Sequence, residues 1–144
     1  MEEREVPNHE SWLLVKCSPN SPDTLQIVAR GKDGDGSNPP YASFLHDQSI
    51  CFIVQRIHVV PEHLRDSQNA RFAQPHYVLL RWQGEACSVM ETALSSHHFT
   101  FFAKMATEAL HTRGAAPQPG HYRVSDLKEV SRQRVIQYFK LESL

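Results

Sequence analysis

The nine histidines are the first residues to consider, because imidazole is both a common metal ligand and an acid–base group. Only His97 and His98 are adjacent in the chain, and neighbouring positions on a helix point about 100° apart. Ligands for one ion are usually separated by three or four residues. Cys-x-x-Cys, His-x-x-x-His and His-Glu-x-x-His motifs are absent from the sequence. We therefore expect no metal site.

Two further chemical motifs fail at their defining positions. The segment Asp33–Asn38 looks like the start of a calcium loop, but Asn38 stands where the sharp turn needs Gly and Phe44 where the loop needs a bidentate Glu. Neither a glycine-rich phosphate loop nor a Gly-x-Ser-x-Gly elbow occurs. The expected protein binds a partner, without a cofactor and without catalysis. An enzyme would instead need a concave pocket with convergent polar groups.

A helix with an aromatic side chain on its polar face is more informative. Between Ser88 and Arg113, apolar residues recur at intervals of three and four, which predicts a long amphipathic helix. Ser95 or Ser96 is predicted to cap its start and Gly114 to end it. The apolar stripe comprises Phe99, Phe102, Met105, Ala106, Ala109 and Leu110. The opposite face holds His97, Thr100, Phe101, Lys104, Glu108 and His111.

Phe101 is the unusual member of that polar face. Aromatic side chains are enriched at the centres of protein interfaces, so Phe101 is predicted to contact a partner. The alternative is that Phe101 packs beneath a loop of the same chain.

The elements that position this helix are mostly β-prone runs. Strands are predicted at Trp12–Cys17, Thr24–Ala29, Ser49–Val60, His76–Gln83 and His121–Val124, with the first two forming a hairpin around a turn at Ser18–Asp23. The Ser49–Val60 strand is apolar on both faces, which indicates a central strand covered on both sides. Tyr41–Asp47 predicts a short helix. Ser125 is predicted to cap a turn, and Ser131 a final helix. Gly31–Pro40 and the long segment 61–75 read as loops.

This order of elements predicts an α/β (α+β) fold with a central mixed sheet flanked by helices. At 144 residues, the whole of 1–144 is expected to form one domain. The net charge of −1 argues against a nucleic-acid partner. Three cysteines without paired spacing predict reduced, buried thiols in a monomeric cytoplasmic protein. Segment 1–11 is a polar tail, and no apolar run approaches the roughly 20 residues that span a membrane.

The segment Tyr77–Lys104 resembles a known family. Trp82-Gln83-Gly84-Glu85 and Ser88, followed by Ser95–His98, are similar to the strand, turn and helix start of coactosin-like proteins. These form a branch of the ADF homology (actin-depolymerising factor/cofilin) domain. Cys51–Ile57 looks like the preceding central strand, and Tyr122–Ser131 like the short strand, turn and last helix of the wider family.

The resemblance implies an actin-binding, cytoskeleton-associated protein that prefers filaments over monomers. It implies a site on the long helix, with charge from a loop and from the C-terminal region. The residues that it assigns to actin or partner binding are His97, His98, Phe101, Lys104, Arg71, Lys128, Arg132 and Arg134.

Three departures from the family pattern favour an alternative partner. Only eleven residues precede Trp12, and Pro7 interrupts them, where the family has a full helix. Glu91 and Ala93 stand where coactosin-like proteins carry Arg and Lys, and His98 replaces a Lys. The loop 61–75 is longer than usual. Because actin is acidic, the missing cations at Glu91, Ala93 and His98 weaken the electrostatic attraction that steers the two proteins together. The alternative is the same fold recruited to a non-actin or actin-related partner.

Overall fold

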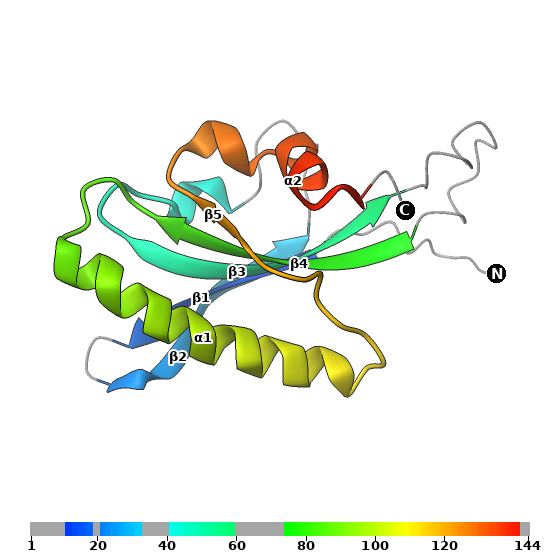
Figure 1. The fold of residues 1–144 in the computed structure, drawn as a ribbon, viewed down its shortest axis with the longest axis horizontal. Coiled ribbons are helices and arrows are strands. Elements are labelled where there is room, and N and C mark those ends of the chain that lie inside the picture. Colours follow the sequence, from blue (N-terminus) through cyan, green and yellow to red (C-terminus); the bar gives the residue numbers. More distant parts are fainter. Residues whose placement is uncertain (1–10, 19–20, 33–40, 60–73, 142–144) are drawn as a thin grey trace.

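A computed structural model describes residues 11–18, 21–32, 41–59 and 74–141. Five strands form one sheet in the order β2-β1-β3-β4-β5 (Figure 1). The β4–β5 pair is parallel and the other pairs are antiparallel, which confirms the predicted mixed sheet. The strands are β1 (Ser11–Ser18), β2 (Ser21–Lys32), β3 (Ile50–Val59), β4 (Gln74–Gln83) and β5 (Tyr122–Val124).

β1, β2 and β4 are longer than predicted, and β2 and β4 extend by two or more residues. β2 begins at Ser21 and runs through Gly31 to Lys32, so the turn predicted at Ser18–Asp23 is shorter and Gly31 is not in a loop. β4 begins at Gln74, where the pairing with β3 ends, and includes Pro75. A proline is tolerated near the start of a strand, so Pro75 lies within β4 although proline is typical of turns. The remainder of the two predicted loops, at 33–40 and 61–73, lies outside the described residues.

β3 is the central strand, as predicted, and its two faces enter different cores. Cys51, Ile53 and Ile57 belong to one cluster of buried residues, and Phe52 belongs to the other. This follows from the strand geometry, since successive side chains point to opposite faces of a sheet. The sheet is therefore covered by a helical layer on each side (Figure 1).

One layer is the long helix α1 (Val89–His111). Phe99 and Phe102 pack on Phe52 of β3, with ring centroids 5.6 and 5.3 Å apart. The other layer holds two short 3-10 helices, η1 (Ala42–Phe44) and η4 (Leu127–Val130), and the helix α2 (Arg132–Phe139). The short helix predicted at Tyr41–Asp47 is thus confirmed as a single 3-10 turn.

Some of the predicted helix caps are confirmed and others are wrong. α1 begins after Ser88, whose hydroxyl accepts from the Glu91 N–H while the Glu91 carboxylate accepts from the Ser88 N–H. The predicted caps Ser95 and Ser96 were wrong, because the helix starts two turns earlier. Gly114, at φ +75°, follows the helix end as predicted. Asp126 rather than Ser125 caps η4, whereas Ser131 caps α2 as predicted.

The thiols differ in their exposure. Cys51 is fully buried, and desolvation raises its pKa to about 12. Cys17 and Cys87 are only half-buried, so the prediction of three buried thiols was wrong for these two. Among the described helices, none combines the length and the apolar character needed to cross a membrane.

Candidate functional site

The polar face predicted for the long helix lies at the protein surface. His97, Thr100, Lys104, Glu108 and His111 are exposed, and Phe101 is half-buried. These residues share one side of α1 because 3.6 residues complete a turn. Phe101 therefore lies partly shielded among exposed polar side chains, and part of it remains accessible to a partner.

The opposite stripe of α1 is buried over only part of its length. Phe99, Phe102 and Leu110 are buried, as predicted. Met105 is 46% exposed and Ala109 is exposed, so these two members of the apolar stripe are not buried against the sheet. The sheet leaves the flank of the helix on which they lie uncovered.

A buried arginine of β4 fixes the N-terminal half of α1 on the sheet. The Arg81 guanidinium donates hydrogen bonds to the hydroxyls of Ser95 and Ser96, the latter at 3.1 Å. Ser95 is fully buried and donates in turn to the Thr92 carbonyl at 2.7 Å. The contact holds the helix at one rotation, which in turn sets the direction of the outward face. The sequence offers one signal for it, a charged residue inside the apolar run Val78–Trp82.

Arg81 has cationic neighbours. Arg123 pairs with it in register on β5, and His121 packs on Phe99 with ring centroids 4.0 Å apart. Burial and then repulsion from Arg123 lower the pKa of Arg81. Burial, followed by Arg81 and Arg123, lowers the pKa of His121. Uncharged His121 is thus favoured beside the two arginines.

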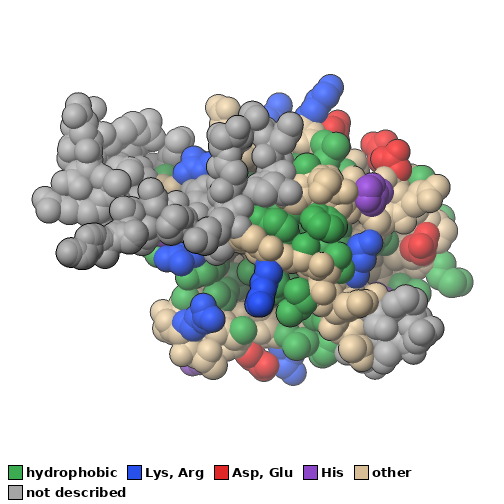
Figure 2. Space-filling model, turned by 180° about the vertical axis from the view of Figure 1, so that it is seen from behind, with side chains coloured by type: hydrophobic (Ala, Val, Ile, Leu, Met, Phe, Trp, Pro, Cys, Tyr) green, Lys and Arg blue, Asp and Glu red, His purple; other side chains and the backbone are tan. Residues whose placement is uncertain are grey.

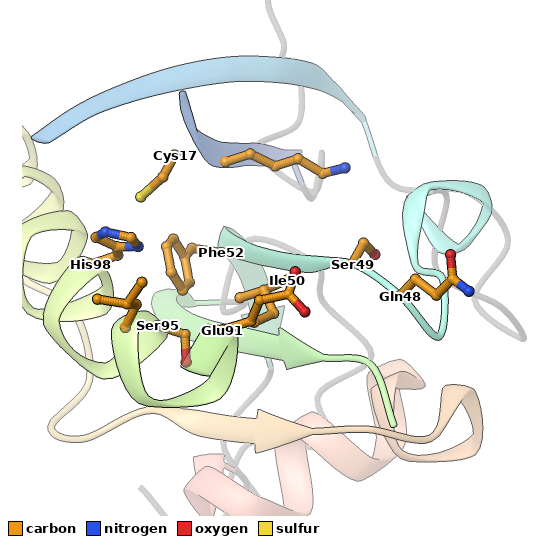
Figure 3. Close-up of a pocket in the computed structure, with 10 residues that line it drawn as sticks. Cys17, Gln48, Ser49, Ile50, Phe52, Glu91, Ser95 and His98 are labelled. Carbon is orange, nitrogen blue, oxygen red and sulfur yellow. The ribbon is translucent and has the colours of Figure 1, made fainter. Parts of the chain in front are cut away.

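His98 is not part of the outward face. Its ring is half-buried and points toward Cys17 and Phe52 on the sheet side of α1 (Figure 3). The cavity there measures about 290 Å³ and is also lined by Lys16, Ser49 and Glu91. The rings of His97 and His98 are 5.9 Å apart and inclined by 61°. The two histidines therefore serve different surfaces, as expected of neighbours on a helix.

Glu91 contributes an acidic side chain to the first turn of α1. Its carboxylate accepts from the Ser88 N–H at 2.8 Å, and this bond explains a Glu at the position where the resemblance implies a cation. In the described part of the chain, no group of three or more His, Cys, Asp or Glu side chains is arranged to hold a metal ion.

The remaining predicted site residues do not join the α1 face. Lys128 and Arg134 are exposed on η4 and α2, which cover the opposite side of the sheet from α1 (Figure 1). Arg132 is half-buried, and its guanidinium donates to the His58 carbonyl at 2.6 Å. Arg71 lies outside the described residues. The structure thus brings together His97, Phe101 and Lys104 and places the C-terminal cations elsewhere.

The order of the elements, with one mixed sheet covered by a helical layer on each face, defines an α+β fold. No family model and no curated protein sequence matches the chain. Solved structures of coactosin do match over most of it. Coactosin from Entamoeba histolytica superposes with a TM-score of 0.58 at 13% identity, covering 94% of this chain and 83% of the other. Mouse coactosin, described as an actin filament binding protein, superposes with a TM-score of 0.53 at 16% identity, covering 90% of this chain and 74% of the other. The chain has the coactosin-like ADF homology fold.

Proposed function

We propose that this protein binds actin filaments without catalysis, through the outward face of α1. The observation that carries the proposal is the exposure of Lys104 and His97 around the accessible part of Phe101. A partly accessible aromatic ring beside an exposed Lys offers a partner both an apolar contact and a charge. The likeness in fold to mouse coactosin, an actin filament binding protein, supports actin as the partner.

The outward face would meet an acidic partner through few charges. Lys104 is its permanent cation and Glu108 opposes it, so the attraction is weaker than that of a face rich in lysine. Binding is therefore expected to depend on salt, because exposed charge pairs are screened over about 10 Å at 0.1 M ionic strength. Lys128, Arg134 and Arg71 are proposed to add long-range attraction.

One observation favours a second candidate function. The first turn of α1 carries Glu91, held in the capping box, and exposed Ala93, where the resemblance implies cations. The same helix face is then proposed to bind a non-actin or actin-related protein. A pull-down with the purified chain separates the two candidates, because the second predicts recovery of a partner other than actin that Lys104→Glu abolishes.

The test of the first candidate is co-sedimentation with filaments at low and high salt, using monomeric actin as a second ligand. Pelleting with filaments that weakens as salt rises supports it. Folded protein that stays in the supernatant at low salt contradicts it.

A further inference from the structure

An open groove runs beside α1 on the flank that the sheet leaves uncovered. It measures about 770 Å³ and lies between the C-terminal half of α1 and strands β1 and β2. Its apolar lining includes Leu13, Leu25, Ile27, Phe102, Met105 and Ala106. Hydrophobic side chains gathered in this way remain available for burial by another molecule.

The groove is a trough rather than an enclosed pocket. Ile27 on one wall is 58% exposed and Met105 on the other is 46% exposed. A small ligand is usually buried over most of its surface, which walls this open do not permit. The α1 residues that line the groove run from Phe102 to Leu110 and span roughly 13 Å at 1.5 Å per residue, and Arg113 follows the end of the helix. A helix of about two and a half turns has this length.

The charges in the groove have one sign. Arg30, Arg56 and Arg113 line it, and no Asp or Glu is among the described residues that line it. Arg56 Nε is buried and has no hydrogen-bond partner within the described part of the chain, and the guanidinium lies 6.0 Å from the Tyr77 ring. Seen from behind, the molecule exposes hydrophobic side chains among Lys, Arg, Asp and Glu side chains (Figure 2).

We propose that this groove binds an acidic amphipathic helix from another protein. Leucine-like side chains on one face of that helix fill the trough, and flanking carboxylates reach Arg30, Arg56 and Arg113. This is the recognition mode in which the apolar side of a helix lies in a hydrophobic groove. The groove occupies a different side of α1 from Phe101 and Lys104, so the inference goes beyond the proposed actin contact.

The test uses a fluorescein-labelled synthetic peptide of about 14 residues, with leucines at helical spacing on one face and glutamates on the other positions. Fluorescence anisotropy with the full-length protein is expected to show saturable binding. The same peptide with lysines in place of glutamates is expected to bind at least about tenfold more weakly. Equal binding of the two peptides, or no binding of the acidic one, overturns the proposal.

Variants inside and outside the groove test where the acidic peptide binds. The double variant Arg30→Glu and Arg113→Glu changes two exposed side chains, and it is expected to weaken binding of the acidic peptide at least about tenfold. Ile27→Glu, on the exposed groove wall, is expected to act in the same direction. The controls are Lys140→Glu and Val89→Glu, both exposed and outside the groove lining, and neither is expected to alter binding. An unchanged affinity in both groove variants contradicts the proposal.

Two other occupants give distinct outcomes. Replacing Glu2, Glu3, Glu5 and Glu10 by Gln neutralises the acidic N-terminal segment in the full chain. Peptide binding that appears only in this variant identifies that segment as the occupant and rules out a partner helix. If sedimentation equilibrium shows a wild-type dimer that the Arg30→Glu and Arg113→Glu variant dissociates, a second copy of this chain occupies the groove. That result also rules out a partner helix. No actin is present in these experiments, so their failure leaves the filament proposal untouched.

Discussion

The Arg81 guanidinium on β4 donates a hydrogen bond to the buried Ser95 hydroxyl on α1. This polar contact joins the long helix to the sheet beside the packed phenylalanines Phe52, Phe99 and Phe102. Together with the packing of Phe99 and Phe102 on the sheet, it orients α1 so that Lys104 and part of Phe101 face solvent.

Ser95 and Ser96 both accept from Arg81, but only Ser95 is buried. Ser95→Ala should lower the free energy of unfolding by about 1–3 kcal/mol, because it leaves a buried cation with fewer partners. Ser96→Ala should lower it by less than about 1 kcal/mol, since water replaces an exposed partner. Urea denaturation of the two variants measures the difference. Equal losses would mean that Arg81 does not depend on the buried contact.

The N-cap of α1 can be tested in the same way. Ser88→Ala removes the acceptor for the Glu91 N–H and should destabilise the fold by about 1 kcal/mol. Ser88→Asp keeps an acceptor and should restore most of the loss. Thermal unfolding followed by circular dichroism distinguishes them. A wild-type melting temperature for Ser88→Ala would show that the helix does not begin there.

Gly84 sits where a side chain has no room. An added Cβ would overlap with the Asp47 carbonyl, next to the hydrogen bond of 2.8 Å from Trp82 Nε1 to the His46 carbonyl. Gly84→Ala should therefore lower the free energy of unfolding by about 1–3 kcal/mol or more, because backbone atoms must shift.

Gly114→Ala is the matched control, because Gly114 has a positive φ and open space around its Cβ position. Its cost should be about 1–2 kcal/mol, from the left-handed backbone alone. Chemical denaturation compares the two. A smaller loss at Gly84 than at Gly114 would contradict the close approach.

Stability should decrease in mild acid. Burial lowers the pKa of His76, and burial with Arg81 and Arg123 lowers the pKa of His121. The unfolded chain, with histidine pKa values near 6.5, then takes up protons at a higher pH than the folded chain. The free energy of unfolding is therefore retained above about pH 6.5 and falls as the pH drops below it.

Urea denaturation between pH 7.5 and 5 measures this effect. His121→Phe keeps a ring against Phe99 and should flatten the pH dependence, whereas His46→Gln, at an exposed position, should leave it unchanged. If the free energy of unfolding depends on pH in the same way in His121→Phe and in wild type, His121 does not cause the loss of stability in acid.

Much of the fold could be predicted from the sequence because strand and helix periodicities are local. The apolar residues on both faces of Ser49–Val60 identified the central strand, and the spacing of Phe99 and Phe102 identified the apolar stripe that packs on it. The helix start was missed, since Ser88, Ser95 and Ser96 are equally good caps by type, and only the tertiary contact with Arg81 draws Ser95 into the core.

The site was less predictable because it depends on which layers the elements occupy. Helical spacing placed Phe101, Lys104 and His97 on one face. It could not show that Lys128 and Arg134 lie across the sheet from them, or that Arg132 bonds to the His58 carbonyl. The exposure of Met105 also depends on how far the sheet extends beneath α1.

Co-sedimentation of the protein with actin filaments at low salt tests the central proposal most directly, with Phe101→Ala, Lys104→Glu and the exposed control Lys140→Glu beside the wild type. The proposal predicts that wild type and Lys140→Glu pellet with filaments, and that Phe101→Ala and Lys104→Glu bind at least about tenfold more weakly. Folded wild-type protein that fails to pellet, or equal pelleting of all four proteins, would contradict it.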